Sequence, residues 1–374
     1  MRIGVPAETR PGETRVAATP ETVKKLAAKN EMRIQVGAGT QSSFPDSEYE
    51  KAGGKIVGSA AEAFDADIVL KVRAPVDAEL VFLKSGATLI GLLEPFNAEG
   101  LEGIAKRGVN GFAMESLPRI SRAQPMDVLS SQANIAGYKA VVLAAAEYGK
   151  FFPMLMTAAG TVKAARVLIL GAGVAGLQAI ATAKRLGAVI EASDVRPAVK
   201  EQIESLGAKF LDVPFLTDEE REIAQGVGGY ARPMPADWMR RQGEAVHQRA
   251  LAADVVITTA LIPGRPAPKL IKEDTVRQMK PGSVIVDLAA EQGGNVEGTE
   301  PGRIVVRNGV KLIGTTNLAA TVPTDASTLY AKNLYNILAL MLDAKTGEFK
   351  IDREDEIIAG TLVCADGEVV KKKG

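Results

Sequence analysis

The sequence has very few of the side chains on which disulfides, metal sites and nucleophilic catalysis depend. Its single cysteine, Cys364, excludes an intrachain disulfide and is typical of proteins from a reducing compartment. Its single histidine, His247, excludes a zinc site built from several histidines and cysteines, and no nucleophile elbow accompanies it. We therefore expect no metal, and we interpret His247 as a surface residue of a helix.

Long apolar runs and an excess of either charge are also absent. No stretch approaches the roughly 18 consecutive apolar residues of a membrane span, and the N-terminal MRIGVPAETR lacks the apolar core of a signal peptide. Basic and acidic residues number 45 each, so nothing favours nucleic acid or an anionic membrane surface as a partner. We expect a cytoplasmic protein without direct membrane insertion.

The composition that is present, 46% apolar and 24% charged over 374 residues, is that of a globular protein with two or three domains. Strand-like and helix-like segments alternate along the chain, which predicts an α/β fold. We expect two Rossmann-like domains with parallel sheets, joined by two long interdomain helices. The predicted domains are residues 1–125 with 325–374, and residues 126–324, the latter with a linking helix and a mobile loop near 220–240.

Residues 166–194 contain the strongest functional motif. Gly171, Gly173 and Gly176 follow an apolar strand at G-x-G-x-x-G spacing, and a helix and a second strand lead to Asp194, 18 residues after Gly176. The first glycine permits a tight turn, the second lets a pyrophosphate approach the backbone, and the third allows close packing of helix on sheet. The helix N-terminus offers free N–H groups to the phosphates. This context predicts dinucleotide binding.

Asp194 favours NAD(H) over NADP(H), because a carboxylate accepts hydrogen bonds from ribose hydroxyls and repels a 2′-phosphate. Arg196 is the counter-argument, since an arginine there could hold that phosphate, but we interpret it as exposed and solvated. A second buried strand, residues 254–259, should bring its carboxyl end to the cofactor. The predicted cofactor-binding residues are Gly171, Gly173, Val174, Ala175, Gly176, Asp194, Val195, Arg196, Thr258, Ala260 and Leu261.

Polar residues also gather where Pro125 is expected to open a long helix from Met126. They are Arg119, Gln124, Asp127 and Ser130. Asp127 and Ser130 share one face of that helix. Such a cluster can cap the helix, or it can bind a carboxamide or a ribose, and the spacing leaves both open.

Two further features lie in loops. Arg15 lies in the loop after the first predicted strand, and Lys71 lies at the carboxyl end of another. Ligands of open α/β sheets bind beyond the carboxyl ends of strands. The two residues are either ligands for a small carboxylate or solvated loop cations. Residues 216–247 form a long segment with several glycines and prolines and the only tryptophan, Trp238, and we interpret it as a mobile flap.

Several segments together resemble one family. They are RIGVPAETRPGETRVAATP, PRISRAQPMDVLSSQANIAGYKAV, MTAAGT, GGYARPM, LIPGRPAPKLI and EQGGN. Over nearly its whole length the chain resembles the NAD(H)-binding domain I, or alpha subunit, of proton-translocating nicotinamide nucleotide transhydrogenase, in the alanine dehydrogenase superfamily. The PRISRAQPMDVLSSQ segment is the most specific to the transhydrogenases.

The resemblance implies roles for particular residues. Arg119, Gln124, Asp127 and Ser130 would bind the nicotinamide end of NAD(H). Within that set, Asp127 and Ser130 would hold the carboxamide, and Gln124 would lie near the partner nucleotide. Tyr230 would belong to a mobile loop that closes over the cofactor.

The implied reaction is direct hydride transfer between NADH on this chain and NADP⁺ on a partner domain III. A separate membrane component would couple it to proton translocation. The resemblance also implies a homodimer and a peripheral place on the cytoplasmic membrane through partner subunits.

The alternative is alanine dehydrogenase, whose substrate-carboxylate residues Arg15 and Lys71 match. Those enzymes use a histidine after the strand equivalent to 88–91, and none is present here. They also have an aspartate where this chain has Glu291. A module that senses NAD without catalysis is a third class.

Overall fold

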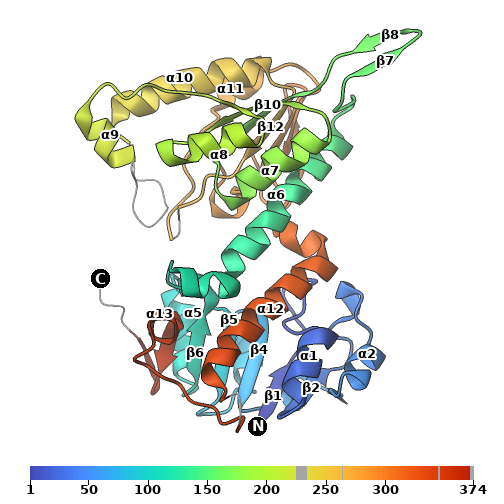
Figure 1. Cartoon of the computed structure of the whole chain (residues 1–374), viewed down its shortest axis with the longest axis vertical. Coiled ribbons are helices and arrows are strands. Elements are labelled where there is room, and N and C mark those ends of the chain that lie inside the picture. Colours follow the sequence, from blue (N-terminus) through green and yellow to red (C-terminus); the bar gives the residue numbers. More distant parts are fainter. Residues whose placement is uncertain (225–233, 263, 344–345, 371–374) are drawn as a thin grey trace. The chain divides into compact units, whose positions relative to one another are not determined.

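The structure, a computed structural model, describes residues 1–224, 234–262, 264–343 and 346–370. The chain divides into two compact units, Met1–Gln132 with Ala319–Gly374, and Ala133–Leu318. We call them unit 1 and unit 2. Helix α6 (Val128–Glu147) runs from the first into the second (Figure 1). The predicted α/β class, with parallel-rich sheets in two domains, is confirmed.

Unit 1 is built on an eight-stranded sheet of order β17-β16-β6-β5-β4-β1-β2-β3. The first six strands in sequence are parallel, whereas β16 and β17 are antiparallel to their neighbours. Because the winding reverses between β1 and β4, the carboxyl ends of these two strands form a topological switch point. The strands are β1 Arg2–Val5, β2 Glu31–Gln35, β3 Lys55–Val57, β4 Ile68–Arg73, β5 Thr88–Leu92, β6 Asn110–Ala113, β16 Leu362–Ala365 and β17 Glu368–Val369.

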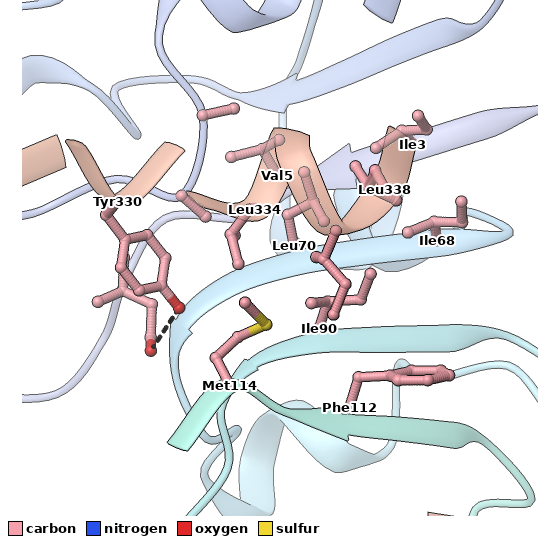
Figure 2. Close-up of a cluster of buried hydrophobic side chains, with 14 of the residues drawn as sticks. Ile3, Val5, Ile68, Leu70, Ile90, Phe112, Met114, Tyr330, Leu334 and Leu338 are labelled. Carbon is pink, nitrogen blue, oxygen red and sulfur yellow. Dashed lines mark hydrogen bonds between the residues drawn. The ribbon is translucent and has the colours of Figure 1, made fainter. Parts of the chain in front are cut away.

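Helices cover both faces of this sheet. Side chains of α1 and α12 join one core cluster, and those of α3 and α5 join the cluster on the other face. Figure 2 shows Leu334 and Leu338 of α12 packed over the strands, and the Tyr330 hydroxyl donates to the carbonyl of Lys71 at 2.8 Å. The helices are α1 Pro20–Ala27, α2 Asp46–Lys51, α3 Ala60–Phe64, α4 Asp77–Leu80, α5 Ala98–Ala105, α12 Pro323–Met341 and α13 Glu356–Thr361, with short η1 Thr40–Ser42, η2 Met114–Ser116, η3 Ser121–Met126 and η6 Leu318–Thr321.

Unit 2 is built on a seven-stranded sheet of order β11-β10-β9-β12-β13-β15-β14, parallel except for β14. Its switch point lies between β9 and β12, and the glycine motif directly follows β9. The strands are β9 Arg166–Leu170, β10 Val189–Ser193, β11 Lys209–Phe210, β12 Val255–Thr258, β13 Val284–Asp287, β14 Ile304–Arg307 and β15 Val310–Ile313.

The helices of unit 2 also lie on both faces of its sheet. Residues of α6, α7 and α8 share one core cluster, and residues of α10 and α11 share the other. They are α7 Val174–Arg185, α8 Lys200–Ser205, α9 Asp218–Ala224, α10 Ala236–Ala252 and α11 Glu273–Gln278, with η4 Pro197–Val199 and η5 Ala290–Gln292. A separate hairpin, β7 Leu155–Thr157 and β8 Gly160–Val162, extends away from the sheet (Figure 1).

Two local predictions are wrong. The long helix does not begin at Met126, because Pro125 lies inside η3 and α6 begins at Val128. The segment 216–247 is not one long loop, since it contains α9 and most of α10. Residues 225–233, which include Tyr230, lie outside the described residues. Among the helices that are described, none is both long and apolar enough to cross a membrane.

Candidate nucleotide-binding site

The glycine turn joins the end of β9 to the start of α7. Gly171 has φ +98°, and a Cβ there would lie 2.6 Å from the Thr259 hydroxyl. A Cβ on Gly176 would lie 1.9 Å from the carbonyl oxygen of Gly171, so the turn closes tightly on the first helical turn. Around Gly173, by contrast, an added Cβ would meet nothing within 4 Å. The open space is therefore where a pyrophosphate would approach the free N–H groups of α7.

Gly137 lies against the first turn of α7, next to this glycine turn. It lies on α6, and a Cβ there would be 2.1 Å from the carbonyl oxygen of Ala175. Helix α6 therefore contacts the first turn of α7 backbone to backbone. The only sequence signal for this contact is a glycine inside a predicted helix, where a packing reason is expected.

Asp194 directly follows β10 and is tied to the glycine turn. Its Oδ2 accepts the N–H of Ala172 at 2.7 Å, and its Oδ1 accepts the N–H of Arg196 at 2.9 Å. The Arg196 side chain donates to both carboxylate oxygens, from Nε at 2.9 Å and from Nη2 at 2.8 Å. Hydrogen bonding to Asp194 raises the pKa of Arg196. The interpretation of Arg196 as a solvated side chain is therefore wrong.

Val195, which lies between Asp194 and Arg196 in the sequence, packs on a small apolar cluster outside the main core. That cluster contains Trp238, which is 2% exposed and stacks on Phe215 with ring centroids 5.9 Å apart. The ion pair of Arg241 with Glu220 joins α10 to α9 beside it. The start of α10 is thereby coupled to the loop that carries Asp194.

A buried carboxylate organises the ends of β12 and β13. Asp287 is fully buried and accepts four hydrogen bonds, from the Thr258 hydroxyl and from the N–H groups of Ala289, Asn295 and Val296. Because every buried acceptor needs partners, this set holds the loop after β13 in one conformation. Thr258 is itself fully buried, so its hydroxyl acts inside this network.

The side-chain amide of Asn295 forms hydrogen bonds with the loop after β12. Its Oδ1 accepts the N–H of Ala260 at 3.0 Å, and its Nδ2 donates to the carbonyls of Ala260 and Pro268, both at 2.8 Å. The amide thus fixes Ala260, while the next residue, Leu261, is 40% exposed. The sequence suggests this clamp only weakly, through an asparagine that directly follows two glycines.

The predicted nicotinamide residues lie in unit 1, at the start of α6. Asp127 caps that helix, because its Oδ1 accepts the N–H of Ser130 at 2.9 Å and its Oδ2 accepts the Ser130 hydroxyl at 2.6 Å. Asn333 and Asn336 of α12 both donate to the carbonyl of Pro125, which fixes the approach to the cap. Capping, one of the two alternatives, is thus present and brings Asp127 and Ser130 together.

The other two predicted residues, Arg119 and Gln124, are exposed positions of the segment before α6. Between them, the Arg122 guanidinium pairs with both oxygens of Asp355 at 2.7 and 3.0 Å. This ion pair ties η3 to the segment that begins α13. This ion pair therefore anchors the backbone that carries the exposed side chains of Arg119 and Gln124.

The switch point of unit 1 contains a buried cluster of charges. Arg15, 3% exposed, pairs with both oxygens of Glu13 at 2.7 and 2.6 Å and donates to Gln132 Oε1 at 2.8 Å. Lys71, 1% exposed, lies 3.0 Å from Glu79 and 3.5 Å from Glu8. Both cations are buried and neutralised, so the interpretation of these two residues as solvated loop cations is wrong.

Glu8 is held in this cluster by the backbone. It accepts the N–H groups of Val72 and Arg73 at 2.7 and 3.2 Å. Burial raises the pKa of Glu8, an effect that the charge of Lys71 opposes. The carboxylates that a bound acid would supply to Arg15 and Lys71 are thus already supplied by the chain.

Comparisons with known proteins agree with this architecture. The alanine dehydrogenase/PNT family is matched by its N-terminal domain over residues 4–136 and by its C-terminal domain over residues 140–372. The chain belongs to the alanine dehydrogenase/PNT family. It is 51% identical to the first part of NAD(P) transhydrogenase subunit alpha of Rhodospirillum rubrum, over 99% of this chain and 98% of that one.

Within this family, the chain is more similar to transhydrogenases than to alanine dehydrogenases. The structure of transhydrogenase from Sinorhizobium meliloti matches with a TM-score of 0.89 and 47% identity, over 99% of this chain and 100% of that one. Alanine dehydrogenase 2 of Staphylococcus aureus is 31% identical, over 92% of this chain and 88% of that one. The resemblance to the transhydrogenase alpha subunit, and with it the prediction of an NAD-binding oxidoreductase of that kind, is confirmed.

Proposed function

We propose that this chain is the NAD(H)-binding component of a proton-translocating transhydrogenase and exchanges hydride between NADH and NADP⁺ on a partner domain. The observation that carries the proposal is the glycine turn with its acid at the switch point of unit 2. It stands in a chain that is 51% identical to a transhydrogenase alpha subunit over almost its full length. The open space at Gly173 and the nearby carboxylate of Asp194 fit the pyrophosphate and ribose of NAD(H).

The chemistry asks little of the protein beyond binding and orientation. A bound dinucleotide supplies the hydride, and no protein group has to move a proton in that step. We propose that Asp127 and Ser130 hold the carboxamide, with Arg119 and Gln124 beside the site of transfer. Tyr230 would help to exclude water. Correct placement of the two reacting rings is then the main contribution to rate.

Asp127 offers a direct test of this assignment. Asparagine is as good an N-cap as aspartate, so Asp127→Asn should leave α6 intact. We expect NADH affinity within a few-fold of the unmodified chain, with slower hydride transfer to NADP⁺ on a supplied partner domain. Strong loss of affinity with normal transfer would contradict a positioning role.

We further propose a homodimer, attached to the cytoplasmic face of a membrane only through partner subunits. The β7–β8 hairpin supports the dimer, because a two-stranded sheet is marginally stable alone. Exposed apolar side chains lie in the hairpin, Met156 at 74% and Val162 at 40%, and directly before it, Met154 at 60%. A second copy that covers this hairpin would bury them. Light scattering of Met156→Glu against the unmodified chain tests the assignment, with a monomer as the expected result.

Alanine dehydrogenase is the second candidate, favoured by the 31% identity to one such enzyme. Two observations oppose it. Arg15 and Lys71 are neutralised by glutamates of the chain. After β5 the chain continues with Leu93 and Glu94, whose N–H groups donate to Glu115, and no histidine stands there. A proton donor for an iminium intermediate is therefore lacking at this position.

One experiment separates the classes. Binding of NADH to the purified chain is followed by its fluorescence, and NADH oxidation is then measured with pyruvate and ammonium. The same measurement is repeated with NADP⁺ and the NADP(H)-binding domain of a transhydrogenase. Oxidation only in the second mixture supports the proposal, and oxidation in the first shows an alanine dehydrogenase. Binding without oxidation in either mixture supports an NAD-sensing module.

A further inference from the structure

The carboxylate of Asp194 has no hydrogen-bonding position left for a ligand. A carboxylate offers about four lone-pair positions. In this chain they are taken by the N–H of Ala172, the N–H of Arg196 and the two guanidinium nitrogens of Arg196. A ribose diol, which needs two of these positions, cannot bind while all four donors are in place.

The four donors differ in how easily they can leave. The two N–H groups belong to the backbone of the glycine turn and of the loop after β10, so they keep the carboxylate in place. The guanidinium is on a flexible side chain that is 21% exposed, against 6% for the side chain of Asp194. Rotation of one side chain would therefore free two acceptor positions without moving the turn.

We propose that the guanidinium of Arg196 holds the place of the ribose diol on Asp194 and is displaced when NAD(H) binds. The inference rests on the proposed function, because it concerns the adenosine end of the same site. It differs from the usual assignment of such an arginine to a 2′-phosphate, since here the positive charge is committed to the neighbouring acid.

The pair disfavours a 2′-phosphate in two ways. Asp194 is fixed by two backbone N–H groups and would repel the phosphate. Arg196, which could otherwise attract it, is neutralised in a bidentate ion pair. It follows that loss of the acid, and not loss of the arginine, should open the site to NADP(H).

The test is calorimetric titration of the full chain with NADH and with NADPH, at one salt concentration. The variants are Arg196→Gln, Arg196→Lys and Asp194→Asn. Arg185→Gln, which changes an exposed arginine in the last turn of α7, is the matched control. Thermal unfolding of each variant is measured alongside.

Because partly exposed ion pairs contribute modestly, we expect Arg196→Gln to bind NADH roughly two- to five-fold more tightly, with NADPH still weak. Arg196→Lys keeps the charge but not the fork and should lie between. Asp194→Asn should weaken NADH and strengthen NADPH, and the control should change neither.

Unchanged or weaker NADH binding by both Arg196 variants, with normal unfolding temperatures, overturns the inference. Failure of every form, the unmodified chain included, to bind NADH would instead overturn the proposed function. If Arg196→Gln does not fold, the lysine variant makes the same comparison.

Discussion

The amide of Asn295 can be tested as the clamp of the loop after β12. Asn295→Ala removes three hydrogen bonds, one accepted from Ala260 and two donated to Ala260 and Pro268. Each such bond contributes about 1 kcal/mol net, so we expect the free energy of unfolding to fall by about 2–4 kcal/mol. The loss also releases Ala260, and we expect weaker binding of NADH by about ten-fold.

Urea unfolding followed by circular dichroism measures the first effect, and calorimetric titration with NADH measures the second. Gln202→Ala, which removes an exposed amide from α8, is the matched control and should stay within about 0.5 kcal/mol. Asn295→Asp keeps the acceptor for Ala260 but loses both donors and adds a charge beside Asp287, so it should be at least as harmful. Unchanged stability and affinity in Asn295→Ala would refute the clamp.

Three further predictions concern single groups. Gly173→Ala has room for its methyl group, so we expect unchanged thermal unfolding but at least ten-fold weaker NADH binding by titration, because the methyl group takes the space of the pyrophosphate. Lys71→Met leaves Glu8 and Glu79 without their buried cation, and we expect a loss of about 3–5 kcal/mol in urea unfolding, smaller at acidic pH. Burial raises the pKa of Glu115 above 4.5, so the folded state binds a proton that the unfolded state releases. Relative to Glu115→Gln, stability should therefore fall as pH rises from 4.5 through the raised pKa, and a rise in that window would contradict the assignment.

The nucleotide-binding half of the fold could be predicted because local signals agree there. An apolar strand, three spaced glycines, a helix and an acid specify β9, α7 and β10 almost without tertiary information. The strands of the hairpin, β14 and the C-terminal pair have only two to four residues each. Segments that short show no clear alternation and take their conformation from their partners.

The errors about side chains have a different origin. Asp194 is only two residues from Arg196, but the sequence does not indicate that its carboxylate would bind two nitrogens of the guanidinium. In the same way, Lys71 is paired by glutamates that come from another loop and from α4. The pairing of Lys71 therefore depends on tertiary contacts. The predicted start of α6 was wrong for another reason, because Pro125 lies inside the preceding η3 and not at the start of the helix.

In both sheets the strands follow the same order on either side of the first strand. Topology alone therefore predicts a ligand-binding crevice in each unit equally well. The two units differ in the segment that leaves the first strand. In unit 2 this segment is a three-residue turn with an open side, and in unit 1 it is a longer loop that inserts Glu8, Glu13 and Arg15 among Lys71 and Arg73. The turn in unit 2 leaves space beside Gly173, whereas the loop in unit 1 places paired charges at the end of its sheet. Fold similarity alone would therefore predict a nucleotide site in each unit. The charges that are already paired in unit 1 argue against the site there.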